Sequence, residues 1–152
     1  MTAALFALLA LCPAHADLAR DVEAAAARYR VDPVALVVLI HAESGCRSGA
    51  VNPRTGAAGL MQVLVEGDAN PAHLTTAALM DPARNVDLGA SKLARLLALC
   101  GGLGASLTLY HGGGKKDAKG RTRCQIDDHA RKLLRRVGKI KSEYKRTQER
   151  KA

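Results

Sequence analysis

The chain has 152 residues and a formal net charge of +9, which is enough for one domain with a single core. It contains no Trp and one Phe, which argues against a β-sandwich and favours closely packed aliphatic helices. From Lys115 onward fifteen Lys and Arg residues stand against five Asp and Glu, so the basic character belongs to the C-terminal segment.

The N-terminal segment has the pattern of a signal peptide. Ala3–Leu11 is uncharged and apolar, too short to span a bilayer, and is followed by the small-x-small sequence Ala14-His15-Ala16. We therefore expect cleavage after Ala16, a periplasmic or secreted mature protein, and no transmembrane segment in it. An apolar first helix of a cytosolic domain is the alternative, and lipoprotein processing at Cys12 is disfavoured because a small residue is expected at Leu11.

The remaining pattern predicts an all-α domain interrupted by two Gly-rich loops. We expect residues 17–139 to form it and residues 140–152 to be a basic tail. Asp-Pro pairs at Asp32 and Asp81 predict capped helix starts. The expected helices are 17–30, 33–44, 82–100, 105–110 and 127 to about 139 or beyond, with a short helix capped by Thr75 or Thr76 and a turn or short helix at 59–62.

Three cysteines remain after the expected cleavage: Cys46, Cys100 and Cys124. An oxidising compartment favours one disulfide and leaves one thiol. The sequence leaves three pairings open, among which we favour Cys46 with Cys124. A zinc site is disfavoured because no close C-x-x-C spacing is present.

Glu43 has the features of a general acid. It ends the helix that follows Asp32 and lies on the same face as Leu36, Leu39 and Ile40. Loss of hydration there, and the negative end of the helix dipole, raise the pKa of a carboxyl group. A carboxyl that keeps its proton near neutrality can protonate the leaving oxygen of a glycosidic bond.

The residues around Glu43 extend this pattern. His41–Gln62 (HAESGCRSGAVNPRTGAAGLMQ), Asp81-Pro82 with Asn85 and Gly89, and Tyr110-His111 follow in order. Over roughly residues 31–137 the chain resembles the lytic transglycosylase catalytic domain, in the superfamily of soluble lytic transglycosylases and goose-type lysozymes.

The resemblance implies a single lysozyme-like domain, all-α or α+β at most, whose Gly-rich loops form a substrate cleft, and it gives roles to matching residues. It implies Glu43 as the single catalytic carboxylate, Ser44 beside the bound sugar, Gln62 shaping the cleft, and Tyr110 with its hydroxyl near the acid. It also implies cleavage of the β-1,4 bond between N-acetylmuramic acid (MurNAc) and N-acetylglucosamine (GlcNAc), with 1,6-anhydro ends and with no metal or cofactor.

The chain departs from the family pattern at three places. His111 stands where the family usually has Asn; because His can also donate and accept, we expect it to bind substrate in place of that Asn. VLVEGDAN (63–70) replaces the usual continuation after Gln62, and the Glu-Thr motif before the last helix has no clear counterpart, although Asp127 and Asp128 lie nearby. A hydrolytic muramidase with a second acid at Glu66, Asp68 or Asp81 is the alternative enzyme. A non-catalytic peptidoglycan-binding assembly factor is the alternative of another class.

The basic tail indicates an anionic partner. We expect contact with a secretion or conjugation apparatus. A nucleic-acid partner is disfavoured because the protein is expected to be exported and no aromatic stacking pattern accompanies the charge.

Overall fold

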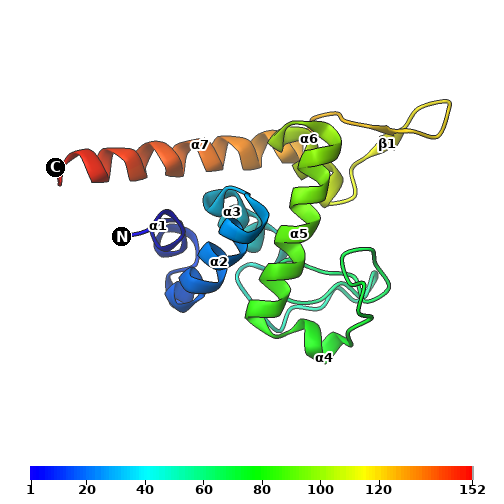
Figure 1. Ribbon diagram of the computed structural model, residues 1–152, viewed down its shortest axis with the longest axis horizontal. Coiled ribbons are helices and arrows are strands. Elements are labelled where there is room, and N and C mark those ends of the chain that lie inside the picture. The colour runs from blue at the N-terminus through cyan, green and yellow to red at the C-terminus, as the bar shows by residue number, and fades with distance from the viewer. Residues whose placement is uncertain (152) are drawn as a thin grey trace.

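The structure, a computed structural model that describes residues 1–151, is almost entirely helical (Figure 1). Its elements are α1 (Ala3–Leu11), the 3₁₀-helix η1 (Pro13–Leu18), α2 (Ala19–Tyr29), α3 (Pro33–Ser44), α4 (Thr76–Leu79), α5 (Pro82–Cys100), α6 (Leu103–Tyr110), β1 (Lys115–Lys116), β2 (Thr122–Arg123) and α7 (Asp128–Glu149). The predicted all-α, lysozyme-like class is confirmed.

Local capping determines where α3 and α5 begin and end. Asp32 accepts hydrogen bonds from the backbone N–H groups of Val34 (2.9 Å) and Ala35 (3.4 Å) at the start of α3. Asp81 caps α5 in the same way, and Gly45 and Gly101, both with positive φ, end the two helices. Both helices have their predicted bounds, because caps and glycine stops act within one helical turn.

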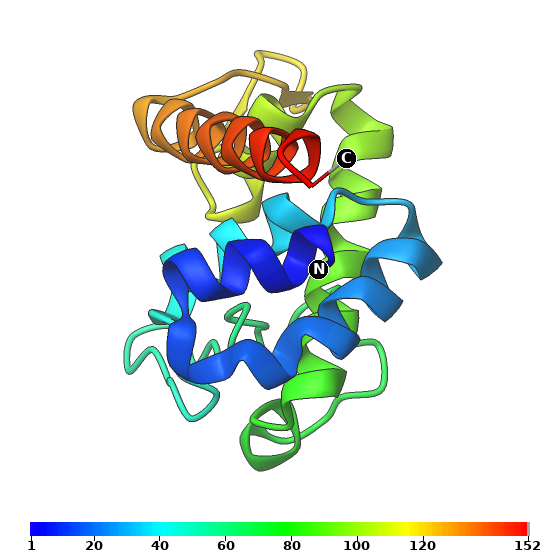
Figure 2. The ribbon, with the colours of Figure 1, turned by 90° about the vertical axis from the view of Figure 1, so that its left-hand side faces the viewer.

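Helix α3 is the centre of the core. Every residue from Val34 to Ile40 is buried, and α1, α2 and α7 pack around it (Figure 2). A helix that is apolar on all sides must be surrounded by other elements. We call α1, η1, α2, α3 and α7 the helical body; α5 and α6 join it to the rest.

Residues 45–81 form a second region, which we call the loop lobe. Its backbone folds over α5 with two isolated bridges, Val51 to Ala58 and Ala58 to Val63. A small apolar cluster (Ala58, Val63, Ala69, Leu79) lies beneath it. Figure 1 shows this lobe beside the lower part of α5, away from α7.

The segment expected to be a signal peptide forms α1, and it packs into the helical body. Ala4, Ala7 and Leu8 are fully buried, and α1 lies against α3 and α7. Among residues 1–151 no helix has both the length and the apolar character needed to cross a membrane.

The disulfides differ from the predicted pairing. Cys12 bonds Cys46 and Cys100 bonds Cys124, with Cα–Cα distances of 5.8 and 5.4 Å. The prediction of Cys46 with Cys124 is wrong, because it removed Cys12 together with the N-terminal segment. With Cys12 present at the end of α1, each thiol has a partner that the packing of α1 or α5 brings within bonding distance.

Two further features were not predicted. The polar loop after α6 contains the short antiparallel pair β1–β2, with Lys115 opposite Arg123, and helix α6 begins at Leu103 rather than 105. The end of the last helix was left open beyond Lys139, and α7 continues to Glu149. Asp127 caps α7 by accepting from the Ala130 N–H group at 2.7 Å.

Candidate active site

Glu43 lies on the last turn of α3, half-buried, where the helical body meets the loop lobe. It lines two adjoining cavities. One, of about 660 Å³, is bounded by the polar loop 47–54 and Gln62, and the other, of about 450 Å³, reaches Tyr110 and His111. The carboxyl group is therefore largely withdrawn from water yet faces an open groove.

Burial raises the pKa of the Glu43 carboxyl group. The positive charges of Lys92 and His111 act in the opposite direction and are the smaller causes. Desolvation disfavours the carboxylate, whereas nearby cations favour it. The balance leaves Glu43 easier to protonate than an exposed glutamate, which is the condition for a general acid near neutral pH.

The Gly59–Gln62 turn is fixed to α5 by Asn85. The Asn85 amide donates to the carbonyls of Ala58 (2.9 Å) and Leu79 (2.7 Å) and accepts from the N–H of Met61 (2.7 Å). A Cβ atom on Gly59, where φ is +81°, would lie 2.2 Å from the Asn85 amide nitrogen. Asn85 and Gly59 together therefore fix the position of the turn relative to α5.

Gln62 lines both cavities beside Glu43. Its backbone is left-handed, with φ at +49°, and its amide donates to the carbonyls of Ala50 (3.2 Å) and Gly59 (3.0 Å). These bonds fix the side chain, while its acceptor oxygen makes no hydrogen bond with residues 1–151. A fixed amide with a free acceptor can orient a sugar hydroxyl or N–H group.

Tyr110, at the end of α6, is buried and donates its hydroxyl proton to the Met61 carbonyl at 3.0 Å. Burial, and to a smaller extent the charge of Glu43, raise the pKa of this phenol, so it stays protonated. Tyr110 links α6 to the same turn that Asn85 holds.

His111 lies at the edge of the cleft and contacts the cap of α7. Its Nε2 is 2.9 Å from Asp127 Oδ2, and its ring packs edge-on against His129 with centroids 4.5 Å apart. The Asp127 N–H donates to the Thr108 hydroxyl at 3.1 Å. The unusual His111 is thus paired with a carboxylate that precedes the last helix.

Ser44 is not brought together with the other predicted residues. It is buried, its hydroxyl donates to the Ile40 carbonyl at 2.9 Å, and it lines neither cavity next to Glu43. A serine hydroxyl near a helix end often bonds the carbonyl four residues earlier.

Lys92 is a cleft residue that the sequence analysis missed. It lies on α5, its ammonium group donates to the Tyr110 carbonyl at 2.8 Å, and it sits 4.0 Å above the centroid of the Tyr110 ring. The sequence does contain a signal for this residue. Lys92 follows the buried Gly89 by three residues and precedes Leu96 by four, so the three lie on one face of α5.

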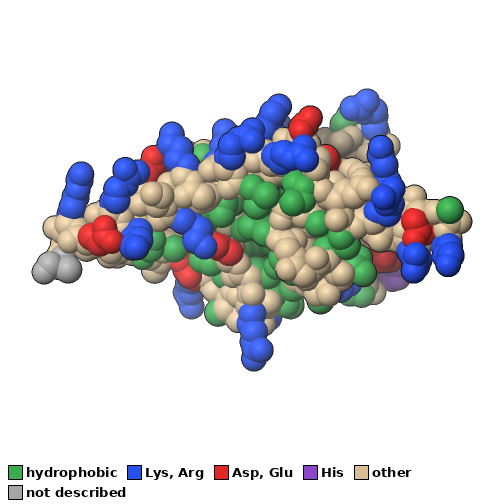
Figure 3. Space-filling model, turned by 90° about the horizontal axis from the view of Figure 1, so that it is seen from above, with side chains coloured by type: hydrophobic (Ala, Val, Ile, Leu, Met, Phe, Trp, Pro, Cys, Tyr) green, Lys and Arg blue, Asp and Glu red, His purple; other side chains and the backbone are tan. Residues whose placement is uncertain are grey.

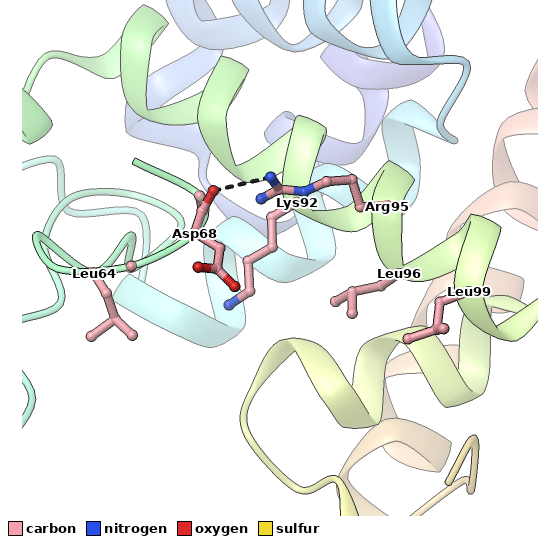
Figure 4. Close-up of a pocket in the computed structure, with 8 residues that line it drawn as sticks. Leu64, Asp68, Lys92, Arg95, Leu96 and Leu99 are labelled. Carbon is pink, nitrogen blue, oxygen red and sulfur yellow. Dashed lines mark hydrogen bonds between the residues drawn. The ribbon is translucent and has the colours of Figure 1, made fainter. Parts of the chain in front are cut away.

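A third cavity, of about 550 Å³, continues the groove beyond Lys92 (Figure 4). Leu64 and Lys92 belong to both this cavity and the one at Tyr110. Arg95, Leu96 and Leu99 follow along α5, and Arg95 donates to the Asp68 carbonyl at 3.0 Å. The divergent segment after Gln62 therefore forms one wall of an extended, largely apolar groove.

Among residues 1–151, no group of three or more His, Cys, Asp or Glu side chains is arranged to hold a metal ion. The functional groups of the site are the Glu43 carboxyl group and the polar and cationic side chains around it.

Comparison with known families gave one match. The family model described as "Transglycosylase SLT domain" matches residues 21–132, which is more than half of the chain and includes Glu43, the loop lobe, Lys92 and His111. No curated protein and no solved structure matches the chain.

Proposed function

The chain belongs to the transglycosylase SLT domain family, and we propose that it is a lytic transglycosylase that cleaves the β-1,4 MurNAc–GlcNAc bond of peptidoglycan and leaves 1,6-anhydro-MurNAc ends. Membership in this family supports peptidoglycan-cleaving activity in general. The observation that carries the finer proposal is the position of Glu43, half-buried, with a raised pKa, and open to the groove.

In the first step Glu43 acts as the acid. Its carboxyl proton moves to the bridging oxygen as the bond between that oxygen and the anomeric carbon of the muramyl sugar breaks. The leaving sugar departs with a new hydroxyl group, and Glu43 becomes a carboxylate. The raised pKa of Glu43 favours the protonated form that this step requires.

In the second step the same carboxylate acts as the base. It takes the proton of the muramyl C6 hydroxyl, whose oxygen bonds to the anomeric carbon and closes the 1,6-anhydro ring. Glu43 is protonated again, and no water is consumed. One carboxylate is sufficient for both steps.

The walls of the groove support a one-carboxylate mechanism. Within the described residues, Glu43 is the only Asp or Glu that lines the two cavities next to it. Asp81 caps α5, Glu66 is exposed, and Asp68 lines only the cavity beyond Lys92. A hydrolase would use a second carboxylate about 5–5.5 Å from the acid for retention, or about 6.5–9.5 Å away for inversion.

Digestion of purified peptidoglycan, followed by mass analysis of the fragments, tests the proposal. Anhydro-muramyl ends are the expected product. Reducing ends, which carry one additional water, would instead identify a hydrolytic muramidase. Binding to the wall without cleavage would identify a non-catalytic assembly factor.

The disulfides and the wall substrate fit a protein that acts outside the cytoplasm. Export with cleavage after Ala16 remains a proposal, and the packing of α1 opposes it. Cleavage would uncover the face of α3 that α1 covers and would leave Cys46 without Cys12. The intact mass of the exported protein, measured without reduction, distinguishes a chain that begins at Asp17 from one that retains α1.

We also propose that α7 docks onto an acidic surface of a secretion or conjugation apparatus. Lys132, Arg135, Lys139 and Arg146 are exposed, follow each other at helical spacing, and form no ion pair with residues 1–151. Figure 3 shows many Lys and Arg side chains along this side of the molecule.

Replacement of Lys132, Arg135 and Lys139 by Gln tests this docking. The variant is expected to cleave purified peptidoglycan normally but to lose assembly of the apparatus in cells. The matched control replaces Arg20, Arg84 and Lys119, three exposed cations elsewhere. Equal behaviour of the two variants in cells would contradict the proposal.

A further inference from the structure

The ammonium group of Lys92 lies in the cleft without a carboxylate bonded to it. Its described contacts are the Tyr110 carbonyl, 2.8 Å away, and the Tyr110 ring, 4.0 Å away. No Asp or Glu of residues 1–151 lies within ion-pair distance of it. A partly buried cation loses hydration, and this cost is not offset here by an ion pair. The position of Lys92 therefore points to a role in the cleft.

The Tyr110 contacts fix where the charge of Lys92 is applied. Lys92 lines the cavity that contains Glu43, and Tyr110 is itself held by its hydroxyl bond to Met61. The ammonium group therefore cannot turn to bulk water without leaving both the carbonyl and the face of the ring. Its charge is held on the Glu43 side of α5.

We propose that Lys92 is a positioning residue for the reaction of Glu43: its fixed charge stabilises the carboxylate that forms when Glu43 protonates the leaving sugar, and it thereby sets the upper pH limit of activity. This inference rests on the function proposed above. Tyr110 acts in it as the support that holds the ammonium group in place.

The two charges influence each other in the expected directions. Burial raises the pKa of Glu43, and the charge of Lys92 is the largest influence that lowers it. Burial lowers the pKa of Lys92, and the charge of Glu43 raises it. A cation near a carboxyl group favours its ionised form. Lys92 thus keeps Glu43 from becoming too weak an acid to give up its proton.

Other charged or titratable groups face Glu43 from the surrounding elements. His111, after α6, is a weaker influence of the same sign and is paired with Asp127. Arg47 and Arg54 line the polar cavity from the loop lobe but are exposed, so solvent screens them. Tyr110 stays neutral. Lys92 is the one among them that is both close and partly withdrawn from water.

The pH dependence of peptidoglycan cleavage tests the inference in four variants. Lys92→Met and Lys92→Gln remove the charge, and Lys92→Gln keeps an N–H donor for the Tyr110 carbonyl. Lys92→Arg keeps the charge. Arg84→Met is the matched control, because Arg84 is an exposed cation on the same helix.

Loss of the charge raises the pKa of Glu43 further, so its acid form persists to higher pH. In both neutral variants, the alkaline limb of the plot of cleavage rate against pH is expected to shift to higher pH by about one unit. The maximal rate should be lower, because a weaker acid donates its proton more slowly. Lys92→Arg and Arg84→Met should keep the limb of the parent protein.

An unchanged limb in a folded neutral variant would overturn the inference. Failure of both neutral variants to fold would overturn it too, because Lys92 would then serve the fold rather than the acid. An inactive parent protein would instead remove the proposed function itself, which the fragment analysis reports separately. A shift confined to the neutral variants supports the inference.

Discussion

The helical body and the loop lobe are stabilised in different ways. In the body, Leu36, Leu39 and Ile40 are fully buried among other aliphatic side chains. The lobe is held by two fully buried amides, Asn70 within it and Asn85 on α5, and each makes three hydrogen bonds to the backbone. The irregular backbone of a cleft wall cannot pair all of its own N–H and C=O groups, as a helix does. Side-chain amides supply the missing hydrogen-bond partners there.

Glu43 stands at the boundary between these regions. Its helix belongs to the body, and the groups that face it come from the lobe, α5 and α6. The body therefore holds the carboxyl group in place, and the lobe, α5 and α6 determine which groups it faces. Variants of the two regions separate these contributions.

Glu43→Gln is expected to have the largest effect, a loss of at least about 10³-fold in cleavage rate, since both chemical steps use this group. The raised pKa means that the ionised carboxyl group destabilises the fold. Unfolding should therefore need equal denaturant for parent and variant near pH 4, and more for the variant near pH 8.

Glu66→Gln is the matched control, because Glu66 is an exposed carboxylate in the lobe. It should retain the parent cleavage rate. A comparable loss in Glu66→Gln would show that a second carboxylate takes part, as in a hydrolase.

Leu39→Ala tests the body. It removes a fully buried side chain from the middle of α3 and should lower the free energy of unfolding by about 2–5 kcal/mol. At a temperature where the variant is still folded, its kcat should stay close to the parent value. Denaturant unfolding and cleavage assays check the two parts, and a normal stability would contradict the assigned core.

Asn85→Ala tests the lobe. It leaves two buried carbonyls and one N–H group without their partner, and we expect a loss of about 2–3 kcal/mol. Unlike Leu39→Ala, it should also lower kcat, because the turn with Gln62 is no longer held. Hydrogen exchange should show lost protection of the Met61 N–H first; uniform loss across α3 would contradict a separate lobe.

Asp127→Ala is expected to have the smallest effect, about 1 kcal/mol, through loss of the α7 cap. Backbone hydrogen bonding, chiefly from Ala130, lowers the pKa of this carboxyl group. Its contribution is present above the ordinary Asp pKa and is lost as the pH falls through the lowered value. Unfolding measurements from pH 7 to pH 2 should show the two proteins converge in acid.

The sequence predicted what depends on neighbours along the chain. The bounds of α3 and α5 follow from Asp32-Pro33, Asp81-Pro82 and the glycines that end them, all within one helical turn. The Thr75 cap of α4 was among the predicted starts for the same reason. Glu43 was predicted as a site residue from its place on the apolar face of its own helix together with the motifs that follow it and carry the family resemblance.

Features that depend on contacts between distant segments were not predicted. The pairing of Cys12 with Cys46 requires that α1 packs on α3, which no local pattern states. Lys92 meets Tyr110 only after α5 and α6 pack together.

The central claim is that Glu43 keeps its proton further toward neutrality than an exposed glutamate does. A ¹³C NMR titration of the glutamate side-chain carboxyl groups measures this directly, with Glu43→Gln used to assign the signal. We predict a Glu43 midpoint clearly above the ordinary value of a glutamate side chain. A Glu43 midpoint equal to or below that ordinary value would contradict the account.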